Sequence, residues 1–159
     1  IQVPGQAPQD LALSPGQPTI VSCTSTTTVD FETAPTALNS VFAGIDWGHD
    51  QWRVDDLPCG ACPPRLAYFN SPNGKCRTFT FVKPGLLQSF TSSAHIQDGH
   101  MTVRSFGAAG NVVETFSAVV TRDACVLFQT GWTQLATSVE VCFDFGWELA
   151  LDNVTYCTP

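Results

Sequence analysis

The sequence predicts an all-β protein, a two-sheet antiparallel β-sandwich of jelly-roll type stapled by disulfide bonds. Short segments rich in β-branched and aromatic residues recur along the chain between Gly, Pro, Asn and Asp, which is typical of sandwiches and barrels. No apolar stripe of helical period persists over the length of a helix, so helix content should be small. Seven cysteines among 159 residues is a high count, and it points to a compartment in which disulfides persist.

The expected strands follow one another from residue 19 to the C-terminal end. Period-2 alternation is clearest in the segment 139–145, where Val139, Val141, Phe143 and Phe145 share one face and Glu140 and Asp144 take the other. A turn is expected at 83–85, because Pro presets φ and Gly tolerates positive φ. The predicted strands are 19–22, 28–32, 51–55, 66–70, 77–82, 86–93, 101–105, 112–120, 126–129, 138–143 and 148–156.

Length and composition predict one domain after a short arm. The chain is 43% hydrophobic, enough for a proper core. Residues 1–18 are rich in Pro, Gly and Gln without a period, so they are expected to form an extended arm or linker, and 19–159 a single sandwich. Because the chain begins at Ile1 without Met or a signal peptide, we expect a processed mature chain or an excised module.

The charge balance argues against anionic partners. Seven Lys plus Arg stand against fourteen Asp plus Glu, for a net charge of −7, which disfavours nucleic acid and anionic membrane and favours neutral ligands. No run approaches the roughly 18 apolar residues of a spanning helix. The low Lys content and the cysteines together predict a secreted, extracellular protein.

The cysteines are odd in number, so one is expected to be unpaired or to link two chains in a dimer. Cys23 and Cys157 flank the first and last of the clearest strands, and a bridge between them would clamp the two ends. The motif Cys59-Gly-Ala-Cys62 is interpreted as part of a stapled loop; a redox site would need a βαβ context and a zinc site a second Cys pair. The expected pairs are Cys23–Cys157, Cys62–Cys76 and Cys125–Cys142.

The segment 43–56 has the composition of a sugar-binding loop. An exposed Trp face stacks on a pyranose ring, while carboxylates, Gln and Arg bind its hydroxyls. Trp52 alternates with Val54 and should be buried, whereas for Trp47 an exposed platform and a buried plug are both open. The candidate ligand-binding residues are Asp46, Trp47, His49, Asp50 and Arg53.

Two carboxylates predict a cation site. Glu32 and Asp152 lie on mostly apolar strands near the two ends of the chain, where burial is costly unless the charge is paired or bound to a cation. If the strands are neighbours, both carboxylates can hold one structural Ca²⁺, which accepts about 6–8 oxygen ligands, including backbone carbonyls.

Phe31-Glu32 on the first strand and Leu151-Asp-Asn-Val154 on the last resemble the calcium-bearing, galactose-binding-like β-jelly-roll modules of secreted enzymes. That resemblance implies a non-catalytic carbohydrate-binding module or small lectin with a structural calcium ion, bound to a glycan or polysaccharide. Such modules carry glycan in loops at one end of the sandwich or on a concave sheet face. The composition looks most like secreted fungal proteins.

Two other functions stay open: a secreted interaction or cell-wall structural protein without a glycan pocket, and a small polysaccharide-active lyase or hydrolase. Catalytic signatures are few, since adjacent carboxylates Asp55 and Asp56 would point to opposite faces of a strand. Asn153-Val-Thr155 is an N-glycosylation sequon, used or unused.

Overall fold

The computed structural model describes residues 21–56, 62, 65–69, 74–122 and 124–159. The predicted arm 1–18 and Cys59 lie outside these residues. The described part consists of strands joined by turns, with one short 3₁₀ helix, η1 (Gly146–Glu148), so the all-β prediction is confirmed. Within the described ranges no helix has the length and apolarity needed to cross a membrane.

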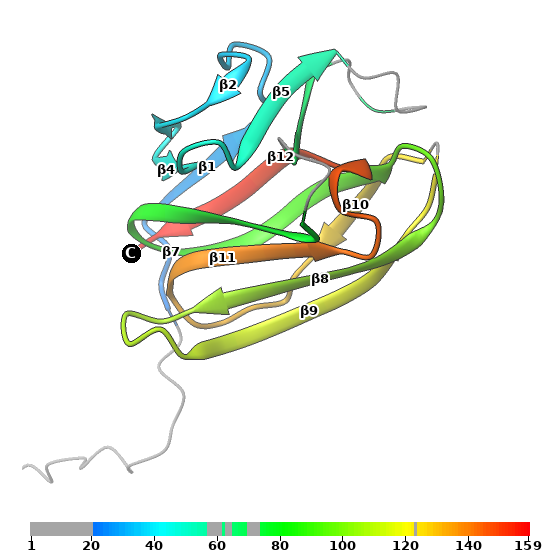
Figure 1. Ribbon diagram of the computed structural model, residues 1–159. Coiled ribbons are helices and arrows are strands. Elements are labelled where there is room, and N and C mark those ends of the chain that lie inside the picture. Colours follow the sequence, from blue (N-terminus) through cyan, green and yellow to red (C-terminus); the bar gives the residue numbers. More distant parts are fainter. Residues whose placement is uncertain (1–20, 57–61, 63–64, 70–73, 123) are drawn as a thin grey trace, which may run out of the picture.

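Twelve strands of the described chain form two antiparallel layers that share one long strand, β7 (Cys76–Ala94) (Figure 1). In sheet 1 the order is β2-β5-β6-β12-β7, with β1 beside β12 and β10 beside β7; its other strands are β1 (Ser25–Val29), β2 (Ala37–Leu38), β5 (Trp52–Asp56), β6 (Arg65–Phe69), β10 (Val126–Gln129) and β12 (Leu149–Thr158). In sheet 2 the order is β3-β4-β7-β11-β8-β9; its other strands are β3 (Val41–Phe42), β4 (Ile45–Asp46), β8 (Gly99–Phe106), β9 (Val112–Val120) and β11 (Ala136–Phe143).

The long strand β7 joins the two sheets. Its first half pairs with β4 and β11 in sheet 2, and its second half pairs with β12 and β10 in sheet 1. The turn predicted at 83–85 is therefore wrong, because the strand continues through Pro84 and Gly85 into the other sheet. The strand passes close to its neighbours there: a Cβ on Gly85 would lie 3.1 Å from Phe81 and 3.3 Å from Tyr156.

The first and last strands lie side by side, as the sequence predicted. Val29 of β1 pairs with Val154 of β12 in an antiparallel ladder. The predicted strand 28–32 is wrong at its C-terminal end, since β1 stops at Val29 and Phe31 has a φ of 58°. Glu32 consequently lies in a turn and is exposed. The predicted strand 19–22 falls partly outside the described residues, and residues 21 and 22 are not in a strand.

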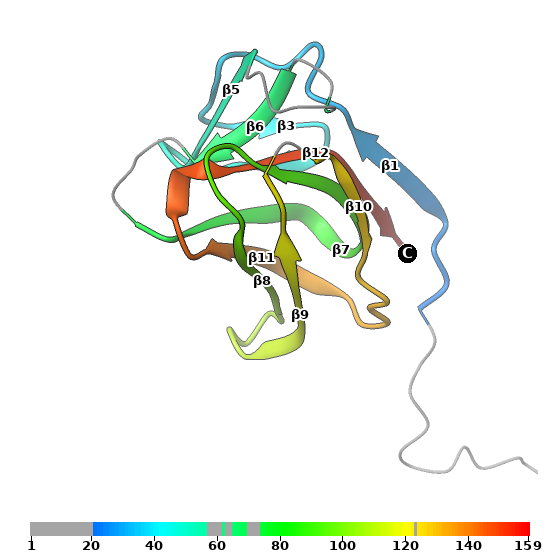
Figure 2. The same ribbon diagram turned by 90° about the vertical axis from the view of Figure 1, so that its right-hand side faces the viewer.

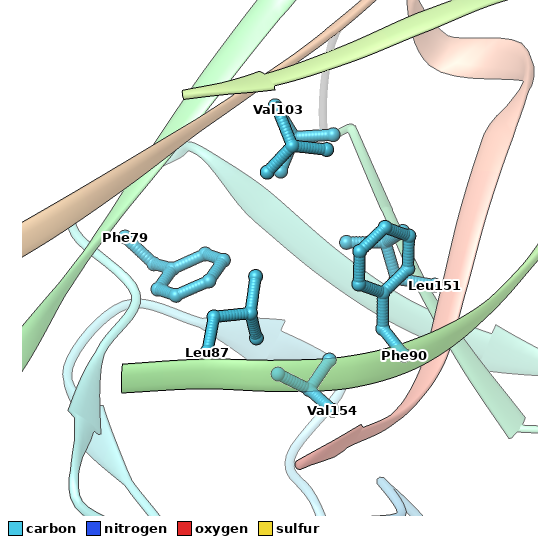
Figure 3. A pocket seen from close by; sticks show the side chains of 7 residues that line it. Phe79, Leu87, Phe90, Val103, Leu151 and Val154 are labelled. Carbon is cyan, nitrogen blue, oxygen red and sulfur yellow. The ribbon is translucent and has the colours of Figure 1, made fainter. Parts of the chain in front are cut away.

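The core fills the space between the sheets. Two fully buried tryptophans, Trp47 and Trp52, meet edge to face with ring centroids 5.6 Å apart. The space between Phe79, Phe90 and neighbouring aliphatic side chains is drawn in Figure 3; it leaves no room for a water molecule. It is a gap in the packing of the core and not a ligand site.

Three disulfides cross-link the sandwich. Cys23 and Cys157 are paired, which joins the chain before β1 to β12 as the strand positions predicted. The predicted pairs Cys62–Cys76 and Cys125–Cys142 are wrong: Cys62 is bonded to Cys125 and Cys76 to Cys142. Cys76 and Cys142 lie directly opposite each other on β7 and β11, a pairing that depends on strand register and not on distance along the sequence.

Candidate functional site

Of the two positions that the sequence left open for Trp47, the structure shows the buried one and not the exposed platform. The alternation that begins with buried Ile45 and exposed Asp46 continues through Trp47, which points into the core and has no exposed surface. Its indole N–H donates to the carbonyl of Phe42 at 3.2 Å, so the buried polar group is satisfied. The interpretation of Trp47 as a sugar-stacking residue is therefore wrong, and it is a core residue like Trp52.

The polar candidates of the same loop are divided between two places. Asp46, His49 and Asp50 are exposed at the end of the β3–β4 hairpin. Asp46 accepts a hydrogen bond from the backbone N–H of Gly48 at 2.9 Å, and Nδ1 of His49 lies 2.8 Å from a carboxylate oxygen of Asp50. Arg53 lies on β5 in sheet 1, 3.7 Å from Asp55. The structure thus keeps three of the polar candidates together and places Arg53 elsewhere.

A row of polar side chains crosses the outer face of sheet 2. Glu140 of β11 is paired with Thr78 on one side and with Arg104 on the other, and Arg104 is paired with Thr115 of β9. Directly opposite residues of antiparallel strands project to the same face, so the four side chains lie side by side. We call this row the polar face, with Thr78, Arg104, Thr115 and Glu140 as its central residues.

An ion pair occupies the middle of the polar face. A guanidinium nitrogen of Arg104 donates to Glu140 at 3.1 Å, and the two side chains are 43% and 27% exposed. Both groups keep free hydrogen-bonding capacity, since a guanidinium has five donors and a carboxylate about four acceptor sites. The pair can therefore bind hydroxyl groups of a ligand without being broken.

The next row of the same face contains one of the predicted residues. Asp46 pairs with Thr80, Thr80 with Ser138, and Ser138 with Phe106. Val82, two residues beyond Thr80 on β7, is an exposed apolar side chain on this face. Asp46 therefore adjoins the polar face, which offers carboxylates, hydroxyls, a guanidinium and small apolar patches in one layer.

Comparison with known proteins identifies the architecture. No family model matches the chain, and no curated protein matches it. Among solved structures it is similar to a DUF4465 family protein from Bacteroides caccae, with a TM-score of 0.51, 12% identity and coverage of 75% of each chain. The fold is a two-sheet β-sandwich shared with other proteins.

Two further similar structures are of an α-L-arabinofuranosidase and an endo-1,4-β-D-xylanase. One is an arabinose-bound MgGH51 α-L-arabinofuranosidase, with a TM-score of 0.52 and 13% identity over 82% of this chain and 26% of that one. The other comprises the CBM22-1 and GH10 modules of Clostridium thermocellum endo-1,4-β-D-xylanase 10B with xylohexaose, with a TM-score of 0.51 and 8% identity over 82% of this chain and 28% of that one. This sandwich thus matches about a quarter of each of these longer chains.

A second polar feature lies on sheet 1, where Asp152 of β12 pairs with Thr91 of β7. Asp152 is 1% exposed, and one of its carboxylate oxygens has no hydrogen-bond partner among the described residues. The hydroxyl of Thr91 is likewise buried without a partner in the described chain. These two oxygens lie on facing positions of neighbouring strands, and they are of the kind that a hard cation binds.

The surroundings of Asp152 disfavour its charged form. Burial raises the pKa of Asp152 from 3.8 to about 6; a hydrogen bond from the backbone of Asn153 opposes the shift, and the charges of Glu32 and Asp30 add to it. The guanidinium of Arg65 reaches this turn, where it donates to the backbone carbonyls of Phe31 and Ala34. Glu32 and Asp152 thus have no ion-pair partner among the described residues.

Two other candidate features, a possible metal-binding cluster and the glycosylation sequon, contain residues that are already bonded within the chain. Cys76, Glu140 and Cys142 bring three potential metal-ligand atoms within 4.8 Å of one another, but the two sulfur atoms form a disulfide and cannot act as thiolates. Asn153, of the glycosylation sequon, is half-buried with a φ of 47°, and its side-chain amide donates to Asp152 at 3.0 Å. Glycosylation of Asn153 stays a prediction.

Sequence reasoning missed Arg104, Thr78 and Thr115. It did place Glu140 on the polar side of its strand, because the alternation of 139–143 is regular. The missing signal is strand pairing: residues 78, 104, 115 and 140 come from four strands, and local periodicity does not say which strands are neighbours.

Proposed function

We propose that this chain is a secreted, non-catalytic carbohydrate-binding module whose glycan lies across the polar face of sheet 2. The single observation that carries the proposal is the four-strand row of Thr78, Glu140, Arg104 and Thr115. Hydroxyls, a carboxylate and a guanidinium in one flat layer match the donors and acceptors that a sugar presents. The net charge of −7 favours a neutral polysaccharide over an acidic one.

The similarity to structures of polysaccharide-acting enzymes supports the choice of ligand class. Arabinose and xylohexaose are the sugars bound in two of those structures, so arabinoxylan and xylan belong in the first panel to be tested. The three disulfides support secretion, because such bonds persist in oxidising compartments.

We also propose a structural Ca²⁺ bound near Asp152. The orphaned oxygens of Asp152 and Thr91 and the nearby charge of Glu32 fit a hard cation, and the remaining ligands would come from backbone carbonyls and water. The ion would stabilise the junction of β1 and β12 in sheet 1, whereas the polar face is on sheet 2. Its loss should therefore lower the stability of the protein more than its glycan affinity.

The test is a binding measurement with matched variants. Titration calorimetry or affinity electrophoresis against soluble arabinoxylan, xylan, glucan and mannan identifies the ligand. Arg104→Ala and Glu140→Gln should weaken binding about tenfold or more, since each removes a hydrogen bond to a charged group, roughly 1.5–3 kcal/mol. His49→Ala and Arg53→Ala are the controls outside the polar face and should bind normally.

Different outcomes separate the candidate sites. Loss of binding in the His49 variant with full binding in the Arg104 variant would place the site in the hairpin loop. Failure of every glycan to bind the folded wild-type protein would favour an interaction or structural protein.

A further inference from the structure

The strand β9 forms an open edge of sheet 2. It pairs with β8 along its whole length and with no other strand of the described chain. Figure 2 shows β9 on the side that faces the viewer. Its outer row of backbone N–H and C=O groups is therefore available to another extended chain, as at any sheet edge.

This edge has some, but not all, of the features that usually prevent pairing. Proteins protect edge strands with Lys, Pro or inward charges. The nine residues of β9 contain neither Lys nor Pro, and four of them are Val. The one charge, Glu114, lies on the inner side of the strand with Phe116. It accepts hydrogen bonds from the backbone N–H groups of Thr133 and Gln134 at 3.0 and 3.1 Å, so its carboxylate is already bound within its own chain.

The edge is also fixed in position. Phe116, at the middle of β9, packs edge to face against Phe90 and Phe128 of sheet 1, with ring centroids 6.0 and 5.9 Å away. A strand anchored in this way loses little conformational freedom when a partner strand is added, and such preorganisation favours association.

The sequence of β9 is complementary to itself when it runs antiparallel. With Phe116 facing its own copy, Thr115 faces Ser117, Val113 faces Val119 and Glu114 faces Ala118. Hydroxyl and β-branched pairs of this kind stabilise a sheet, and no two like charges face each other. The regular part of this register runs from Glu114 to Ala118 on both copies; at Val113 the pairing of β9 with β8 shifts, so the strand is irregular there.

We propose that a second copy of this chain pairs antiparallel along β9 and forms a symmetric dimer with one continuous sheet. The two-fold axis of an antiparallel strand pair is perpendicular to the sheet, so the polar faces of both copies lie on the same side. Across the dimer the strand order would be β8, β9, the copy's β9 and the copy's β8. The two β8 strands, which carry Arg104, would therefore be three strand spacings apart, about 15 Å. If the polar face binds glycan, the dimer binds one polysaccharide at two points.

Sedimentation equilibrium of Cys59→Ser protein tests the dimer, because that background excludes covalent dimers through Cys59. We expect a monomer–dimer equilibrium, and Thr115→Lys should weaken it by about tenfold or more, since each copy would then place a cation at the shared strand pair. The matched control is Thr26→Lys on β1, an exposed threonine on a strand that pairs with β12. It should dimerise like the parent.

A second readout does not depend on any substitution. Hydrogen exchange of the β9 amides should slow as protein concentration rises, while that of β1 stays constant. If Thr115→Lys does not fold, Ser117→Lys repeats the test at the facing position. A protein that stays monomeric up to about 1 mM, the range of very weak complexes, overturns the proposal. So does a dimer that Thr115→Lys and Ser117→Lys leave unchanged. The outcome is independent of whether any glycan binds.

Discussion

The hydroxyl of Tyr156, on the last strand, donates a hydrogen bond to the carbonyl of Ala43 at 2.8 Å. Ala43 and Gly44 form the tight turn of the β3–β4 hairpin, with φ angles of 51° and 76°. The bond ties this hairpin of sheet 2 to β12 of sheet 1. It also fixes the position of Asp46, which lies at the end of the hairpin beside the polar face.

This contact makes Gly44 sensitive to substitution. An added Cβ at Gly44 would collide with the Tyr156 hydroxyl, whereas Gly110 has the same φ of 76° and nothing within 4 Å of the added atom. Both alanine variants strain the backbone by about 1–2 kcal/mol, but Gly44→Ala should lose roughly 2 kcal/mol more through the collision and the broken hydrogen bond. Urea denaturation of the pair measures the difference, and equal losses would show that the turn adapts.

The buried tryptophans should be required for stability and not for glycan recognition. Trp47→Ala and Trp52→Ala should each lower the free energy of unfolding by about 3–5 kcal/mol, because both rings are fully buried. Phe145→Ala is the control, since that ring is 41% exposed and its loss should have a smaller effect. A Trp47→Ala variant that is as stable as the wild type but has lost glycan affinity would show that Trp47 belongs to the binding site.

Chelation should destabilise the protein if calcium binds near Asp152. Adding EDTA should lower the melting temperature by roughly 5–10 °C, as expected for removal of a saturating ligand from a chain of this size. Asp152→Asn should abolish the response, and exposed Asp56→Asn should retain it. An identical melting temperature with and without EDTA, in protein shown by metal analysis to contain calcium beforehand, would contradict the site.

The calcium-free protein should also lose stability as the pH rises. The pKa of Asp152 is raised by burial from 3.8 to about 6 in the folded chain, so between these values the folded state binds a proton that the unfolded state has released. The contribution is fully present below about pH 4 and is lost as the pH rises through 6, by about 2–3 kcal/mol. Urea denaturation in EDTA from pH 4 to 7 measures it, and Asp152→Asn should lack this component. If the wild-type protein instead gains stability relative to Asp152→Asn as the pH rises, the Asp152 carboxylate is stabilised in its charged form.

One cysteine should remain outside the three bridges. Six of the seven cysteines are paired in the structure, and the seventh, Cys59, lies outside the described residues. Denatured, unreduced protein should show one thiol per chain, or else a covalent dimer on a non-reducing gel, and Cys59→Ser should remove both signals. A wild-type chain with neither signal would indicate that Cys59 is modified.

The sequence by itself determined most of the strand segments and their buried faces, although it missed the short strands β2, β3 and β4 and divided β7 into two. The predicted segments 112–120 and 126–129 coincide with β9 and β10, because period-2 alternation and turn residues are local properties. It also predicted the adjacency of the two ends and the Cys23–Cys157 bridge, since the first and last strands of closed two-sheet folds are often neighbours.

Only the tertiary structure decided which strands pair and in which register. That pairing joins Cys76 to Cys142 and Cys62 to Cys125, places Arg104 beside Glu140, and brings Thr91 opposite Asp152. The sequence did not decide whether the ring of Trp47 is exposed or buried. Its direction is set by the preceding hairpin turn, which depends on positive φ at Ala43 and Gly44. Register depends on contacts between segments far apart in the chain, and no local pattern of residues contains that information.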